Sequence, residues 1–411
     1  MRITLKTIPL ILLLFTGTIT SAQVVNVNLF SKMDVSPQYT LWDGSNTMLM
    51  GYTELLGEAI DLPSPLIIVN EGDSVDLSLT NFSQPAPHTI HLHGLDVNQQ
   101  NDGVPHLSFQ IPHDSTGHYY FVAPHAGTYL YHCHVLSTLH VQAGMYGMLI
   151  VRPTNGSNTT WNGGYTFDSE HAWLFSEIDT NWHTFSVIND PWDPQSNSQL
   201  LLDYAPQYFL VNGLSEQQLY SNEASVNASV GEVVYMRLAN IGYYGNRVIF
   251  PEHVNAKIIS SDGRPLPSEV VTDTVSIMPG ERYGVLVEPT IETNSFINID
   301  YFNLNTQQTA NTQKVPLNVD GFIGYIVTEK NQMLIYPNPT NDYFNVILPE
   351  TLKEGEIVVT NMLGQIVYST KIQLLDTDRY TLETLDWDEG IYLIQFDSQN
   401  GQLTEKIIIK K

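Results

Sequence analysis

Metal-binding side chains are concentrated in one stretch of this 411-residue chain, from His88 to Met145. The candidate ligands in it are His88, His91, His93, His132, Cys133, His134, His140 and Met145. Imidazole, thiol and thioether groups at such short spacings are typical of a metal site. The sequence therefore predicts that this stretch binds metal ions.

Four of these residues match the ligand set of a blue-copper electron-transfer site, which is a thiolate, two imidazoles and a weak axial thioether. Cys133, His140 and Met145 come from one loop, and His88 is the candidate for the second imidazole. Zinc also binds Cys and His but does not usually take Met. The prediction is a type 1 copper site.

Two His-x-His pairs, at 91/93 and 132/134, indicate a second metal centre. Residues two apart on an extended strand lie on the same face of it. His132 and His134 should therefore face away from Cys133, which lies between them. We expect a second centre beside the first, joined to it through the backbone of Cys133.

The elements that position these ligands are predicted to be β-strands. Val75, Leu77 and Leu79 alternate with polar residues after Gly72, as in a half-buried antiparallel strand. The same pattern recurs after Gly231, so we expect two copies of one β-domain. The second copy has no Cys and no His-x-His pair, which predicts that it keeps the fold without the metal.

The start of the chain indicates an exported protein. Arg2 and Lys6 precede a short apolar run, the pattern of a signal peptide. A formal charge of -26, from 17 Lys and Arg against 43 Asp and Glu, argues against a nucleic-acid partner. The single Cys excludes an intrachain disulfide.

The stretch His88-x-x-His91-x-His93, with His132-Cys133-His134 and Gly144-Met145, resembles the metal-rich domain of multicopper oxidases. The similarity extends into the second copy, at 208–213 and 262–283. It implies cupredoxin-like Greek-key β-sandwiches with type 1 copper on His88, Cys133, His140 and Met145. It also implies type 2 and type 3 copper, which form a trinuclear cluster that reduces dioxygen, on His91, His93, His132 and His134.

Two acidic residues, Asp96 and Asp102, follow the first histidines and could supply protons to reduced oxygen. Two other features depart from the family pattern. Five residues, 135–139, precede His140 where the family usually has three. The cluster usually takes eight histidines, whereas this chain shows four. We therefore expect a homo-oligomer in which two first sandwiches face each other and share the cluster.

The end of the chain resembles the C-terminal sorting domain of type IX secretion. The motifs are Tyr336-Pro337-Asn338-Pro339, Asn361-x-x-Gly364, Gly390-Ile391-Tyr392 and Lys410-Lys411. The resemblance implies a small β-sandwich, passage through the type IX secretion machinery, and a secreted or cell-surface protein. The predicted all-β chain has a signal peptide (1–22), a copper-binding sandwich (23–153), a second sandwich (161–329) and a sorting domain (333–411).

The predicted function is that of a secreted multicopper oxidase, with a phenolic, amine or metal-ion electron donor and dioxygen as its substrates. One alternative is a copper nitrite reductase. That family has an Asp at the position of His91 and has no His after the Cys, at the position of His134. The other alternative is a non-enzymatic blue-copper carrier or copper-binding protein, which would explain the missing half of the cluster.

Overall fold

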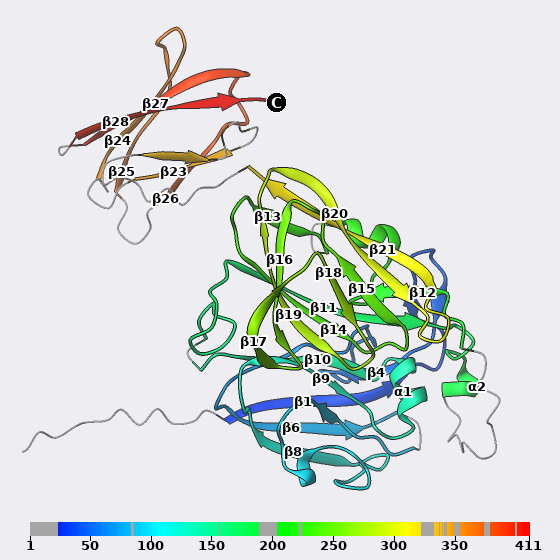
Figure 1. Cartoon of the computed structure of the whole chain (residues 1–411). Helices are drawn as coiled ribbons and strands as arrows, with labels where there is room; N and C mark the ends of the chain where they lie inside the picture. The colour runs from blue at the N-terminus through cyan, green and yellow to red at the C-terminus, as the bar shows by residue number, and fades with distance from the viewer. Residues whose placement is uncertain are drawn as a thin grey trace, which may run out of the picture. The chain divides into compact units, whose positions relative to one another are not determined.

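In the computed structural model, nearly all of the regular secondary structure is β-strand (Figure 1). The structure describes residues 24–83, 86–154, 156–188, 204–221, 224–321, 333–336, 338, 340, 343–348, 354–373, 379–398 and 401–411. The predicted signal peptide, 1–22, lies outside the described residues. Among those described, no helix has the length and apolar character needed to cross a membrane.

Two four-stranded sheets form the first sandwich. One contains β4 (Met50–Thr53), β1 (Val24–Met33), β6 (Ser74–Asn81) and β8 (Thr116–Val122), and the other contains β5 (Ile67–Asn70), β10 (Tyr146–Arg152), β9 (Gly127–His132) and β7 (His91–His93). A short hairpin, β2 (Tyr39–Thr40) and β3 (Asn46–Thr47), lies outside these sheets. Val75, Leu77 and Leu79 of β6 are buried in the core between the two four-stranded sheets, which confirms the strand predicted at these residues.

The second sandwich repeats the arrangement of the first. One of its sheets contains β12 (Tyr208–Val211), β11 (Ser169–Ile178), β14 (Val234–Asn240), β19 (Arg282–Pro289), β16 (Val254–Ser261) and β17 (Arg264–Val271). The other sheet contains β13 (Val226–Ser229), β21 (Thr309–Asp320), β20 (Thr293–Phe302), β15 (Gly245–Ile249) and β18 (Thr274–Ile277). β11 runs parallel to β14, which pairs antiparallel with β19. β1, β6 and β8 pair in the same way, so the predicted repeat is confirmed.

Strand β9 carries side chains to two different cores, because successive residues of a strand point to opposite faces. Tyr129, Tyr131 and Cys133 lie in the core of the first sandwich. Leu130 lies in a separate apolar cluster that also contains Leu174 of the second sandwich. The two sandwiches are therefore packed against each other over the sheet that contains β9.

Helices are short and few among the described residues: α1 (Ser137–Ala143), α2 (Phe185–Ile188), and the 3₁₀ turns η1 (Gln99–Asn101) and η3 (Glu216–Tyr220). Helix α1 lies where the sequence indicated only a long loop before His140. Leu136 precedes it with φ 46°, and Gly144 ends it with φ 118°. A left-handed residue at this end is usually Gly, because a Cβ is unfavourable there.

The sorting domain has its own core. One of its sheets contains β22 (Leu334–Tyr336), β23 (Tyr343–Ile347) and β26 (Arg379–Glu383). The other sheet contains β25 (Ile366–Gln373), β24 (Glu354–Asn361), β27 (Gly390–Ser398) and β28 (Gly401–Ile409). Phe344, Ile357, Ile394 and Phe396 are fully buried between them. The small C-terminal β-sandwich predicted from the sequence is confirmed.

Candidate metal centres

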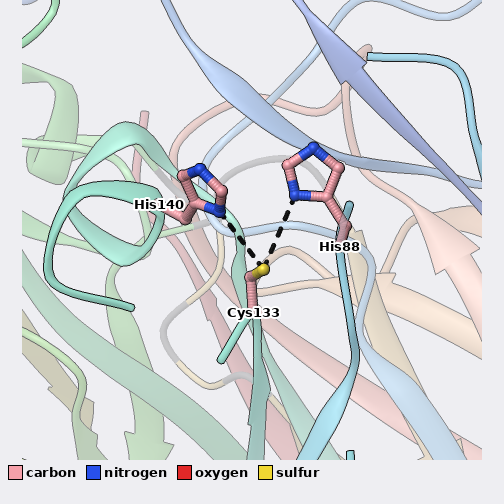
Figure 2. A group of neighbouring side chains, drawn as sticks. All are labelled: His88, Cys133 and His140. Atoms are coloured by element: carbon pink, nitrogen blue, oxygen red, sulfur yellow. Dashed lines mark hydrogen bonds between the residues drawn. The ribbon is translucent and has the colours of Figure 1, made fainter. Parts of the chain in front are cut away.

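Three side chains from separate parts of the first sandwich meet around one sulfur atom (Figure 2). Cys133 Sγ lies 3.6 Å from His88 Nδ1 and 3.4 Å from His140 Nδ1. His88 precedes β7, Cys133 follows β9, and His140 lies on α1. All three are completely buried. We call these residues, together with Met145, the cysteine group.

Met145 is held beside this group by its main chain. The amide of Cys133 donates to the carbonyl of Met145 at 3.0 Å, and the amide of Met145 donates to the carbonyl of His140 at 3.0 Å. The Met145 side chain is fully buried in the same core as Cys133. The structure therefore brings the four residues of the predicted type 1 site together.

The chemistry of the cysteine group fits a soft metal cation. Burial lowers the pKa of His140 to about 4 and that of His88 well below its ordinary value, so both rings are neutral at pH 7. Burial raises the pKa of Cys133 to about 11. A thiolate buried among neutral rings needs a positive charge to stabilise it, and a bound copper ion would supply that charge.

A hydrogen bond outside the cysteine group orients one of its rings. Ser83 Oγ lies 2.5 Å from His88 Nε2, on the side of the ring opposite Cys133. If Nε2 carries the proton, Nδ1 is left as the atom that can bind a metal. Such outer hydrogen bonds fix the tautomer and the orientation of ligand histidines. No local sequence pattern marks Ser83, so its contact with His88 is evident only in the folded chain.

Four histidines form a second group, which we call the histidine group: His91, His93, His132 and His134. The ligand atoms of His91, His93 and His132 all lie within 4.8 Å of one another. His91 lies directly opposite His132 in the β7–β9 pairing. The ring centroid of His134 lies 5.2 Å from that of His91. Both predicted His-x-His pairs therefore meet at one place.

The rings of the histidine group are available as metal ligands. Burial lowers the pKa of His132 to about 3, and burial with the nearby Arg282 lowers that of His93 to about 4. Both are therefore neutral at pH 7. His91 Nδ1 lies 2.7 Å from the carbonyl oxygen of Asp102, so this nitrogen carries the proton and Nε2 is the one that can bind a metal.

The two candidate proton donors lie in different surroundings. A carboxylate oxygen of Asp102 lies 3.5 Å from His91 Nδ1. The carboxylate of Asp96 lies 2.5 Å from the Arg264 guanidinium and 3.7 Å from His125. Asp102 therefore contacts the histidine group directly, whereas Asp96 forms an ion pair with the second sandwich.

The described part of the second sandwich borders the histidine group without adding ligands to it. A Cβ at Gly280 would lie 3.1 Å from Cε1 of His93, and the Arg282 guanidinium lies against Gly94. Within the described residues of this sandwich, His, Cys, Asp and Glu form no group of three close ligands. Pro279-Gly280-Glu281-Arg282 was part of the sequence resemblance, but its position beside His93 could not be inferred from it.

Comparison with known proteins assigns the family. Residues 44–156 and 182–319 match two family models that are both described as multicopper oxidase. The chain belongs to the multicopper oxidase family. Residues 334–410 match the model of a secretion system C-terminal sorting domain, so this multicopper oxidase chain ends in a type IX sorting domain.

Curated relatives of this multicopper oxidase chain are considerably longer. An iron transport multicopper oxidase of Candida albicans is 28% identical over 302 residues, which cover 72% of this chain and 44% of that protein. A laccase of Oryza sativa subsp. japonica is 28% identical over 245 residues, which cover 57% of this chain and 41% of that protein. The chain thus spans less than half the length of these relatives.

Solved structures match this chain over most of their own length. The Blue Copper Oxidase from Nitrosomonas europaea has a TM-score of 0.58 and 25% identity, and the match covers 75% of this chain and 91% of that one. A copper nitrite reductase from Nitrosomonas europaea has a TM-score of 0.54 and 19% identity, and the match covers 72% of this chain and 94% of that one. The latter shows a shared fold only.

Proposed function

We propose that the protein is a secreted copper-dependent oxidase, which takes single electrons from a small donor and reduces dioxygen. The observation that carries the proposal is that the cysteine group and the histidine group lie on opposite sides of one segment, His132-Cys133-His134. His132 Nδ1 also donates to the carbonyl oxygen of Cys133 at 3.0 Å. The two centres are thus connected by both the chain and a hydrogen bond.

His88, Cys133, His140 and Met145 would hold type 1 copper, and His91, His93, His132 and His134 would hold type 2 and type 3 copper. Copper would supply one-electron oxidation at the first centre and dioxygen reduction at the second. The chain keeps the first centre buried and holds the imidazoles neutral. Asp102, beside His91, would supply protons at the second centre.

The histidine group holds four ligands, and we propose that a second copy of the chain completes it. Gly280 of the chain's own second sandwich lies against His93. The partner's histidines would therefore approach on the side of His91 and His134, both of which are partly exposed. The site is then formed about a two-fold axis between identical first sandwiches.

Copper content measured together with oligomeric state tests the shared cluster. Three shared ions per dimer plus one type 1 ion per chain give about two and a half copper ions per chain. A monomer with a value near one, and no type 3 absorption, would rule the shared cluster out.

Oxygen uptake tests the oxidase proposal. The copper-loaded protein should consume dioxygen with a phenolic, amine or cuprous donor, and Cys133→Ser should abolish both this uptake and the thiolate-to-copper absorption. Absence of uptake in a protein that shows the absorption would favour the carrier.

Nitrite reduction is the second candidate, because three imidazoles of one chain already lie close enough to hold a single ion. A copper-containing nitrite reductase of Neisseria meningitidis is 26% identical over 251 residues, which cover 59% of this chain and 56% of that protein. Nitrite consumption with a reduced dye, in the absence of oxygen uptake, would replace the oxidase proposal with this one.

A further inference from the structure

Helix α1, which carries His140, lies between the copper site of the first sandwich and the surface of the second. Leu139 is buried in a cluster with Trp182 and Val187 of the second sandwich. His140, the next residue, points toward Cys133 (Figure 2). The helix thus contacts the second sandwich through Leu139 and carries a candidate ligand at the next position.

Gln142, at the end of α1, makes a buried polar contact with the second sandwich. Its Nε2 donates to the carbonyl oxygen of Glu177 at 2.7 Å and lies 3.4 Å from His183 Nε2. His183 Nδ1 lies 2.7 Å from the carbonyl oxygen of Met48, which can only accept. Nδ1 therefore carries the proton, and Nε2 accepts from Gln142. Both N–H groups of the Gln142 amide are used.

The start of α1 is held by the same part of the second sandwich. Tyr243 Oη donates to the carbonyl oxygen of Thr138. The amide of Tyr243 in turn donates to the Glu177 carboxylate at 2.8 Å. The contacts at both ends of the helix therefore lead to Glu177, which is buried on β11.

We infer that the second sandwich, which adds no ligands in its described part, sets the geometry and the reduction potential of the type 1 site by fixing α1. Gln142 and Tyr243 are the positioning residues, and they act through His140. The potential of such a site depends on ligand geometry and on the surrounding hydrogen bonds. This inference rests on the proposed function only in that type 1 copper is bound at the cysteine group.

The long spacing before His140 has a role in this arrangement. Residues 135–139 include the first turn of α1, and therefore both Thr138 and Leu139. Both residues contact the second sandwich, Thr138 through Tyr243 and Leu139 in the cluster with Trp182. The departure from the family spacing thus coincides with the contact between residues 135–139 and the second sandwich.

The test is a redox titration of the thiolate-to-copper absorption in the full-length, copper-loaded protein. Gln142→Leu and Tyr243→Phe should keep one type 1 ion per chain. They should change the Cu(II)/Cu(I) equilibrium with a fixed redox partner roughly tenfold, about 59 mV for one electron. The copper hyperfine splitting in electron paramagnetic resonance should change with it.

Tyr39→Phe is the matched control. Tyr39 Oη donates to the carbonyl oxygen of Gly213 at 2.7 Å, so it is also a phenol that bonds to the opposite sandwich, but this hydrogen bond does not involve α1. The reduction potential of the type 1 site in Tyr39→Phe should equal that of the parent. An unchanged potential in Tyr243→Phe, or an equal shift in Tyr39→Phe, would overturn the inference. The measurement needs no turnover, so a protein without oxidase activity still gives a result.

Discussion

At the scale of single residues, Cys133 connects the cysteine group, to which its side chain belongs, with the histidine group, to which its two neighbours belong. Its sulfur faces His88 and His140 inside the first sandwich. Its neighbour His132 meets His91 and His93 on the other side. The residues that support these ligands, Ser83 and Asp102, each contact a single ring and can be tested separately.

Ser83→Ala removes the hydrogen bond to His88 Nε2 and leaves Nδ1 in place. We expect the affinity of the cysteine group for copper to fall about 10- to 100-fold, because outer-shell partners of ligand histidines contribute that much. Titration of the thiolate-to-copper absorption with a competing chelator measures it. Ser78→Ala, which removes only a bond to Asn28, is the control and should leave the affinity unchanged. Equal affinities for parent and Ser83→Ala would contradict the assignment.

Asp102→Asn keeps the carbonyl contact to His91 but removes the carboxylate. We expect turnover to fall by roughly 100-fold or more, as for loss of a proton donor, with the type 1 absorption retained. Steady-state oxygen uptake across pH measures this. Asp96→Asn tests the other candidate, and its ion pair with Arg264 leads us to expect little loss. If Asp102→Asn turns over like the parent at every pH, Asp102 is not the donor.

Glu177 should make the stability of the protein depend on pH. Burial raises its pKa from 4.5 to about 7, so between these values the folded chain binds more protons than the unfolded one. Stability should therefore decrease as pH rises through this window, by about 3 kcal/mol at most. Urea midpoints at pH 5 and pH 8 should differ less in Glu177→Gln than in the parent. Parallel profiles would show that Glu177 does not cause the decrease.

At the scale of elements, the cysteine group depends on strand β9 and helix α1, which position Cys133 and His140. β9 directs alternate side chains into the two cores, and α1 then returns His140 to the sulfur of Cys133. The sequence indicated a long loop here. The helix forms because its apolar residue Leu139 is buried against the second sandwich, and a seven-residue helix is not stable without such packing.

Leu139→Ala should destabilise the protein by about 2–4 kcal/mol, because it removes a buried side chain from the cluster with Trp182 and Val187. Chemical unfolding of the copper-free protein measures the change without a contribution from the metal. Leu107→Ala is the control, since Leu107 is 51% exposed, and it should change stability little. Similar losses in both variants would show that α1 is not held by this cluster.

At the scale of the whole molecule, the first sandwich, which contains the cysteine group, and the sorting domain have separate cores. The buried residues of the C-terminal sandwich all come from the chain after residue 332. Sorting and copper binding should therefore be separable. The type IX sorting domain indicates a secreted or cell-surface protein.

A chain that lacks residues 333–411 should bind the same number of copper ions and show the same thiolate-to-copper absorption as the parent. In a host with the type IX machinery, the full chain should reach the cell surface or the medium, whereas the truncated chain should remain inside the cell envelope. Copper analysis and cell fractionation measure the two properties. Loss of copper from the truncated chain would contradict the separation.

The sequence by itself determined the strand repeat, the ligand types and the faces on which they lie. The alternation of His132, Cys133 and His134 is a local property of extended backbone, so it was predictable without a structure. Only the tertiary structure decided that Gly280 borders His93, that Ser83 orients His88, and that α1 is held by Glu177 and Tyr243. Gln142 and Glu177 are 35 residues apart, and no short-range pattern marks either of them. Such contacts arise when the two sandwiches pack together, which depends on the whole buried surface rather than on any one segment.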